Sequence, residues 1–102
     1  MGFNVALEDE HGTRLGQIDD PENLLHQVLP QREDDSYSLL SGVDWYGDTV
    51  FNRLQLPALR TELQRLQRQV VSAKHVELLE RIARLAARAE AEVHLYLRFI
   101  GD

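Results

Sequence analysis

Val93-His94-Leu95-Tyr96-Leu97-Arg98-Phe99-Ile100 alternates apolar and polar side chains more regularly than any other stretch of this sequence. One face of the stretch is apolar and carries Val93, Leu95, Leu97 and Phe99. The other face carries His94, Tyr96 and Arg98. A period of two residues is typical of a strand with one buried side. The stretch therefore predicts a β-strand whose apolar side packs on another layer.

The residues before this strand predict that layer. A first apolar stripe recurs at spacings of three and four and consists of Leu56, Leu59, Leu63, Leu66 and Val70. Its register would place Glu77 and Glu80 in the apolar seam, so the pattern breaks near Val71-Ser72. A second stripe follows and consists of His75, Leu79, Ile82, Ala86 and Ala89. Two antiparallel helices are favoured, and a single bent helix over residues 56–92 is the alternative.

The first half of the chain predicts a hairpin and a short helix. Residues 3–7 and 13–17 form the two strands, and Gly12 supplies the turn between them. The helix starts at Asp20-Pro21-Glu22, with Asp20 as its cap and Pro21 in its first position, and Pro30 ends it.

The sequence of residues 37–54 is compatible both with a strand and with a helical turn. A strand is favoured for residues 37–43, because a turn-like stretch over residues 45–48 and the strand-forming Thr49-Val50-Phe51 follow. The whole sequence predicts one α+β domain over residues 1–102. An antiparallel sheet of three to five strands is packed on one face by an α-helical hairpin, with one short helix added.

Charge is divided unevenly along the chain. Residues 1–52 hold eleven acids and two bases, whereas residues 53–102 hold nine bases and six acids, and the net charge is −6. An acidic protein is repelled by nucleic acid and by anionic membranes and is attracted to basic proteins. We therefore expect a basic protein partner and neither nucleic acid nor membrane. The chain has no cysteine and no secretion signal at its start, so we expect a cytoplasmic location.

Motifs for catalysis or cofactor binding are missing from the sequence. The four histidines form no HExxH pattern, and no phosphate-binding glycine loop or G-x-S-x-G occurs. We predict no metal site, no cofactor and no catalytic residue.

Two segments are candidates for binding. The segment 44–53 concentrates the single Trp, a Tyr, two Asp, an amide and a guanidinium, a mixture typical of binding hot spots. The opposing interpretation is that its aromatic side chains close the sheet edge while its polar residues cap turns. The polar face of the 93–100 strand is the second candidate. The predicted partner-binding residues are Asp44, Trp45, Tyr46, Asp48, Asn52, Arg53, His94, Tyr96 and Arg98.

Three functions remain open. The favoured one is a small acidic protein-binding module, in its concrete form an immunity- or antitoxin-like inhibitor of a basic partner. The second is a small enzyme or enzyme subunit with one cleft, formed by Asp44, Asp48, Asn52, Arg53 and His94. It requires Asp48 and His94 to converge. The third is a structural module that dimerises through its helix stripes.

The segments Tyr46-Gly47-Asp48-Thr49-Val50-Phe51-Asn52-Arg53-Leu54-Gln55 and His94-Leu95-Tyr96-Leu97-Arg98-Phe99-Ile100-Gly101-Asp102 resemble those of a group of small uncharacterised bacterial proteins. The acidic hairpin and the Asp20-Pro21 helix start are similar too. The resemblance implies a bacterial cytosolic protein and implies no activity.

Overall fold

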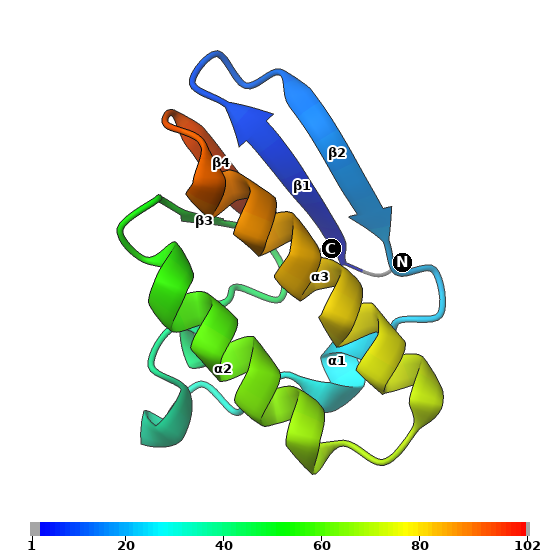
Figure 1. Cartoon of the computed structure of the whole chain (residues 1–102). Helices are drawn as coiled ribbons and strands as arrows, with labels where there is room; N and C mark the ends of the chain where they lie inside the picture. The colour runs from blue at the N-terminus through cyan, green and yellow to red at the C-terminus, as the bar shows by residue number, and fades with distance from the viewer. Residues whose placement is uncertain (1–2, 102) are drawn as a thin grey trace.

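Four antiparallel strands form an open sheet in the order β2-β1-β4-β3 (Figure 1). They are β1 (Asn4–Asp9), β2 (Arg14–Asp19), β3 (Asp48–Phe51) and β4 (Leu95–Ile100). The computed structural model describes residues 3–101, so Met1, Gly2 and Asp102 of the predicted domain lie outside the described residues. β4 pairs with β1 on one side and β3 on the other, and its side chains alternate because one face of the sheet is buried and the other is open.

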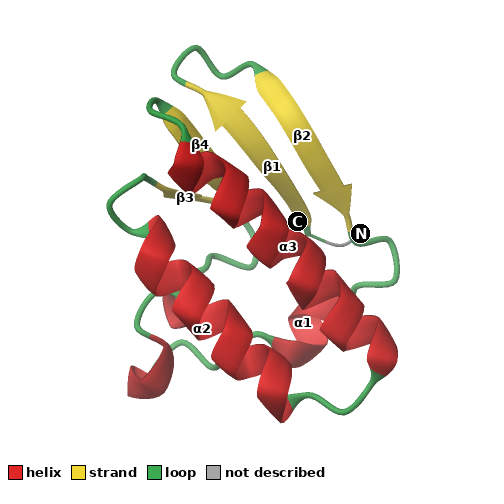
Figure 2. Ribbon diagram, viewed as in Figure 1, coloured by secondary structure: helices red, strands yellow, loops and turns green. Residues whose placement is uncertain are grey.

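Helices α2 (Leu56–Gln69) and α3 (Ala73–Ala91) lie side by side on one face of the sheet (Figure 2). The predicted α+β architecture, with a helical hairpin on one face, is confirmed. Residues 70–72 leave the helical conformation, so the chain forms two helices and not one bent helix. Ser72 stands at the cap position of α3, but its side chain makes no capping hydrogen bond. None of the described helices is long and apolar enough to cross a bilayer.

The core lies between these two layers. The sheet contributes Val5, Leu7, Leu97 and Phe99, and the helices contribute Leu59, Leu63, Leu79 and Ile82. β2 is covered closely by α3, because a Cβ added at Gly16 would lie 3.1 Å from a side-chain methyl of Leu85. The opposite face of the sheet has no described layer over it, and each strand contributes a polar side chain to it: Glu8, Arg14, Asp48 and Arg98.

The short helix α1 (Leu24–Val28) begins later than the sequence predicts. Asn23 adopts a left-handed conformation with φ of 58°, which excludes Pro21 from the first helical turn. Asp20 still acts as a cap, because its buried carboxylate accepts hydrogen bonds from the backbone N–H groups of Leu24 (2.9 Å) and Leu25 (2.7 Å).

The favoured strand over residues 37–43 is wrong. This segment forms two short 3₁₀ helices, η1 (Asp35–Tyr37) and η2 (Leu40–Gly42). Its backbone is held by Glu62 of α2, whose buried carboxylate accepts hydrogen bonds from the N–H groups of Leu39 (3.1 Å) and Leu40 (2.9 Å). A strand does form over residues 48–51, as the strand-forming side chains predict.

Candidate functional site

Strand β3 divides the first predicted binding segment into two ends. Asp44, Trp45 and Tyr46 precede β3, and Asn52 and Arg53 follow it. Four residues of strand separate these ends by about 13 Å. The segment 44–53 therefore contributes to two different surfaces.

Hydrogen bonds fix the loop before β3 in one conformation. Asp44 donates its N–H to the hydroxyl of Thr49 (2.8 Å), and the Asp44 carboxylate accepts from the N–H of Tyr46 (2.9 Å). The N–H of Gly101 donates to the carbonyl of Gly47 (2.7 Å). The loop is thus bonded both within itself and to the end of β4, which is the kind of preorganisation that lowers the entropy cost of binding.

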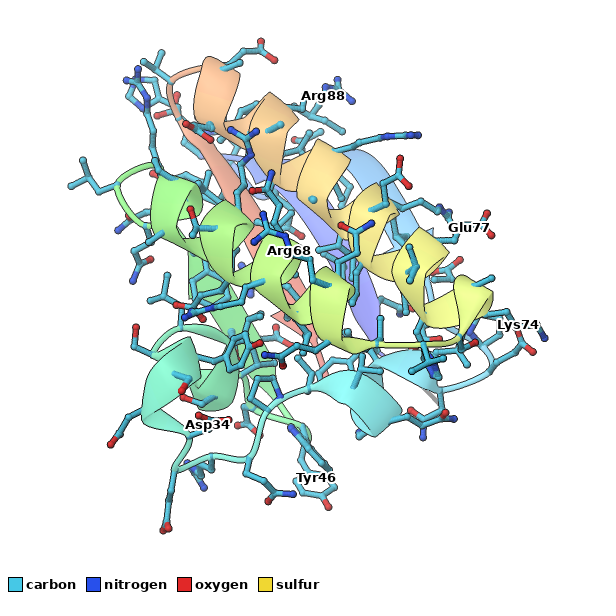
Figure 3. The ribbon with its side chains drawn as sticks, turned by 60° about the horizontal axis from the view of Figure 1, so that its bottom comes forward. Asp34, Tyr46, Arg68, Lys74, Glu77 and Arg88 are labelled. Carbon is cyan, nitrogen blue, oxygen red and sulfur yellow. The ribbon has the colours of Figure 1, made fainter. Side chains whose placement is uncertain are left out.

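Trp45 and Tyr46 have different roles in this loop. Trp45 is half-buried and meets the ring of His26 edge-on at a centroid distance of 5.0 Å. His26 in turn lies against Phe3 at 4.6 Å. Tyr46 points outward and is 80% exposed (Figure 3). Trp45 therefore anchors the loop in the core, and Tyr46 presents an aromatic ring to solvent.

A hollow of about 230 Å³ lies beside these aromatic residues. It is lined by Gln31, Arg32, Ser41, Val43, Asp44, Trp45 and Tyr46. Gln31 and Arg32, which line one wall, are followed in the chain by Glu33, Asp34 and Asp35. Residues 31–46 therefore hold four acids and one base. We call the hollow with Tyr46 and these acids the Tyr46 surface. The hollow itself is lined by one base, Arg32, and one acid, Asp44, and the excess of acids lies in the residues that follow Arg32 along the chain.

The second predicted group is only partly on the open sheet face. Tyr96 and Arg98 lie there, but β4 begins at Leu95 and His94 occupies a turn with φ of 62°. The prediction that His94 belongs to the strand is wrong. Its Nδ1 lies 3.5 Å from the carboxylate of Glu10 at the tip of the β1–β2 hairpin.

Arg98 belongs to a row of charges that crosses all four strands. Its guanidinium donates to Glu8 of β1 (2.8 Å) and to Asp48 of β3 (3.0 Å), and Arg14 of β2 donates to the same Glu8 (3.3 Å). The bond to the Glu8 carboxylate is the main reason that the pKa of Arg98 is raised. The row neutralises itself within the sheet, so Asp48 and Arg98 stabilise neighbouring strands. Asp48 and Arg98 are two of the nine predicted residues, and they come into contact because β3 and β4 are neighbours in the sheet.

A second hollow, of about 360 Å³, joins the remaining predicted residues. Its lining is Asn52, Arg53, Leu54, Val93, His94, Leu95 and Tyr96. Asn52 has a structural role, because its side-chain oxygen accepts from the N–H groups of Leu54 (3.0 Å) and Gln55 (3.2 Å) just before α2. Arg53 is exposed on the rim.

The cleft required by the enzyme interpretation does not form among the described residues. Asp48 is paired with Ile100 at one end of β4, whereas His94 precedes the other end. These positions are about 20 Å apart along the strand. Within residues 3–101, no three His, Asp or Glu side chains gather in a way that could hold a metal ion.

Several residues important to these surfaces were missed in the sequence. Glu8 and Glu62 are buried carboxylates, and His26 is the support of Trp45. The alternation of β1 places Glu8 opposite the core, but its burial depends on the arginines of two other strands. Comparison of the chain with family models, with curated proteins and with solved structures found no match.

Proposed function

We propose that this protein binds a basic partner protein through the Tyr46 surface and acts as an immunity- or antitoxin-like inhibitor or regulator of that partner. The observation that carries the proposal is the exposed ring of Tyr46 on a loop that is held in place by the Trp45 anchor and by three hydrogen bonds donated by backbone N–H groups. Exposed aromatic residues in fixed positions are enriched among binding hot spots.

Charge supports the choice of a basic partner. The Asp44 carboxylate and the acids of residues 33–35 lie around the hollow or follow its wall along the chain. Figure 3 shows Asp34 and Tyr46 projecting on the same side of the molecule. Negative charge around an aromatic anchor accelerates association with a basic protein and selects against acidic ones. We place this activity in the cytoplasm.

The test compares wild-type bait with Tyr46→Ala and with the control Tyr96→Ala, which removes a ring from the other surface. Each protein is immobilised and exposed to extract from the source cells, and bound proteins are quantified by mass spectrometry. We expect a basic protein that wild type and Tyr96→Ala retain and that Tyr46→Ala loses. Retention should fall steeply between 50 and 300 mM salt, at which the Debye length shortens from about 14 to about 6 Å. A capture pattern that is the same for both variants would contradict the proposal.

A further inference from the structure

Strand β2 leaves one side of its backbone unpaired, because among the described strands it pairs only with β1. The N–H of Asp20 donates to the carbonyl of Phe3 (3.1 Å), and ladder bonds in antiparallel pairs alternate along the strand. The backbone groups of Ile18 therefore point toward β1, and those of Gln17 and Asp19 point away from it. Exposed edges are usually blocked by charged side chains (especially Lys), by Pro, by a β-bulge or by a covering segment. β2 contains neither Lys nor Pro, and its irregularity is confined to its start, where the register with β1 shifts between Leu7 and Glu8.

Charges of opposite sign stand at the two ends of this edge. Arg14, Gln17 and Asp19 share the open face of the sheet and form a continuous row. The guanidinium of Arg14 donates to the side-chain oxygen of Gln17 (2.7 Å), and the Gln17 amide donates to the carboxylate of Asp19 (2.6 Å). The row therefore has a base at its start, which also donates to Glu8 (3.3 Å), and an acid at its end.

We propose that β2 pairs with the β2 strand of a second copy of this chain, antiparallel about a two-fold axis at Gln17. In this register Asp19 of one copy faces Leu15 of the other and lies next to Arg14 of that copy. Opposite charges on neighbouring cross-strand positions stabilise a pair, whereas a parallel arrangement would place like charges together. The two sheets then form one eight-stranded sheet, and the two-fold axis closes the assembly at a dimer.

The one contact already made at this edge is compatible with the pairing. Arg88 of α3 donates to the carbonyl of Leu15 (3.3 Å). A carbonyl oxygen has two lone pairs and accepts a second hydrogen bond. The opposite edge of the sheet is less suitable, because β3 has only four residues. This dimer uses a different edge from the Tyr46 surface and does not depend on the proposed function.

The first test is the mass in solution, measured by light scattering after size exclusion over a range of protein concentrations. Wild type should run with the mass of two chains. Gln17→Pro removes an outward N–H and the side-chain amide that joins Arg14 to Asp19, but it removes no hydrogen bond to β1, so it should fold with an unchanged circular dichroism spectrum and run as one chain. A monomeric wild type at all concentrations would overturn the proposal. So would a dimer that Gln17→Pro leaves intact, or masses that grow beyond two chains, which would indicate β2–β3 filaments.

Cysteine cross-linking tests the register, since the chain has no natural cysteine. Gln17→Cys places two thiols on opposite positions, where the Cα–Cα distance of about 5.5 Å suits a disulfide. Leu15→Cys is the matched control, since its two copies would lie about 14 Å apart along the strands. Mild oxidation should therefore convert most of Gln17→Cys into a covalent dimer and little of Leu15→Cys. Equal cross-linking of the two variants, or none in either, would refute the axis at Gln17.

Discussion

The carboxylate of Glu62 supports the segment that leads to the Tyr46 surface, and its removal should cost much of the stability of the protein. Glu62 is only 5% exposed and accepts hydrogen bonds from the hydroxyl of Ser38 (3.3 Å) and from the N–H groups of Leu39 (3.1 Å) and Leu40 (2.9 Å). In Glu62→Ala these two backbone donors lose their acceptor. Water can reach the half-buried Leu39 but not the fully buried Leu40.

An unsatisfied buried donor costs about 1–3 kcal/mol, and a bond to a charged acceptor contributes about 1.5–3 kcal/mol. In Glu62→Ala the N–H of Leu40 has no hydrogen-bond acceptor, whereas the N–H of Leu39 bonds to water. We therefore expect the free energy of unfolding to fall by about 2–4 kcal/mol. At about 4–8 °C per kcal/mol, the midpoint of thermal unfolding should fall by about 8–32 °C.

The assay is thermal and urea unfolding followed by circular dichroism, with two matched variants. Glu62→Gln keeps one acceptor oxygen and should lose about half as much as Glu62→Ala. Glu77→Ala removes an exposed glutamate from α3 and should stay within about 0.5 kcal/mol of wild type. Amide exchange should also accelerate first at Leu39 and Leu40. A loss below about 1 kcal/mol in Glu62→Ala, or one equal to that of Glu77→Ala, would refute the reasoning.

Two further predictions concern the loop and the hairpin. A Cβ at Gly101 would lie 2.4 Å from the carbonyl oxygen of Trp45, so Gly101→Ala should displace residues 44–47, destabilise the fold by about 1–3 kcal/mol and shift the amide resonances of that loop. The control Gly42→Ala meets no atom within 4 Å and should leave the spectrum unchanged; equal effects would contradict this account. The backbone N–H of Thr13 is the main cause of a lowered pKa at Asp9, so this carboxylate stabilises the hairpin above pH 3.8 and ceases to do so as the pH falls through its folded pKa. Carbon-detected titration should place the pKa of Asp9 below 3.8, and the stability difference between wild type and Asp9→Asn should disappear in acid. A pKa of Asp9 at or above 3.8 would contradict this prediction.

The parts of the fold that follow from local pattern could be predicted. β4 alternates with period two, and the leucines of α2 and α3 recur at spacings of three and four, because each element buries one face. Glu77 marked the break between the helices, since a charged side chain is excluded from an apolar seam. The clustering of Trp45, Tyr46 and Asp44 on a loop was likewise visible in the sequence.

Tertiary contacts decided what local pattern left open. Residues 37–43 do not form a strand, because Glu62, more than twenty positions away, accepts the hydrogen bonds of the Leu39 and Leu40 N–H groups. The strand order β2-β1-β4-β3 brings Arg98 between Glu8 and Asp48, and no spacing along the chain reveals that contact. The sequence by itself determined the two layers, since periodicity is a property of neighbouring residues. Only the tertiary structure decided which charges are buried, which loop is anchored and which strand edge is free, because those depend on partners brought together by folding.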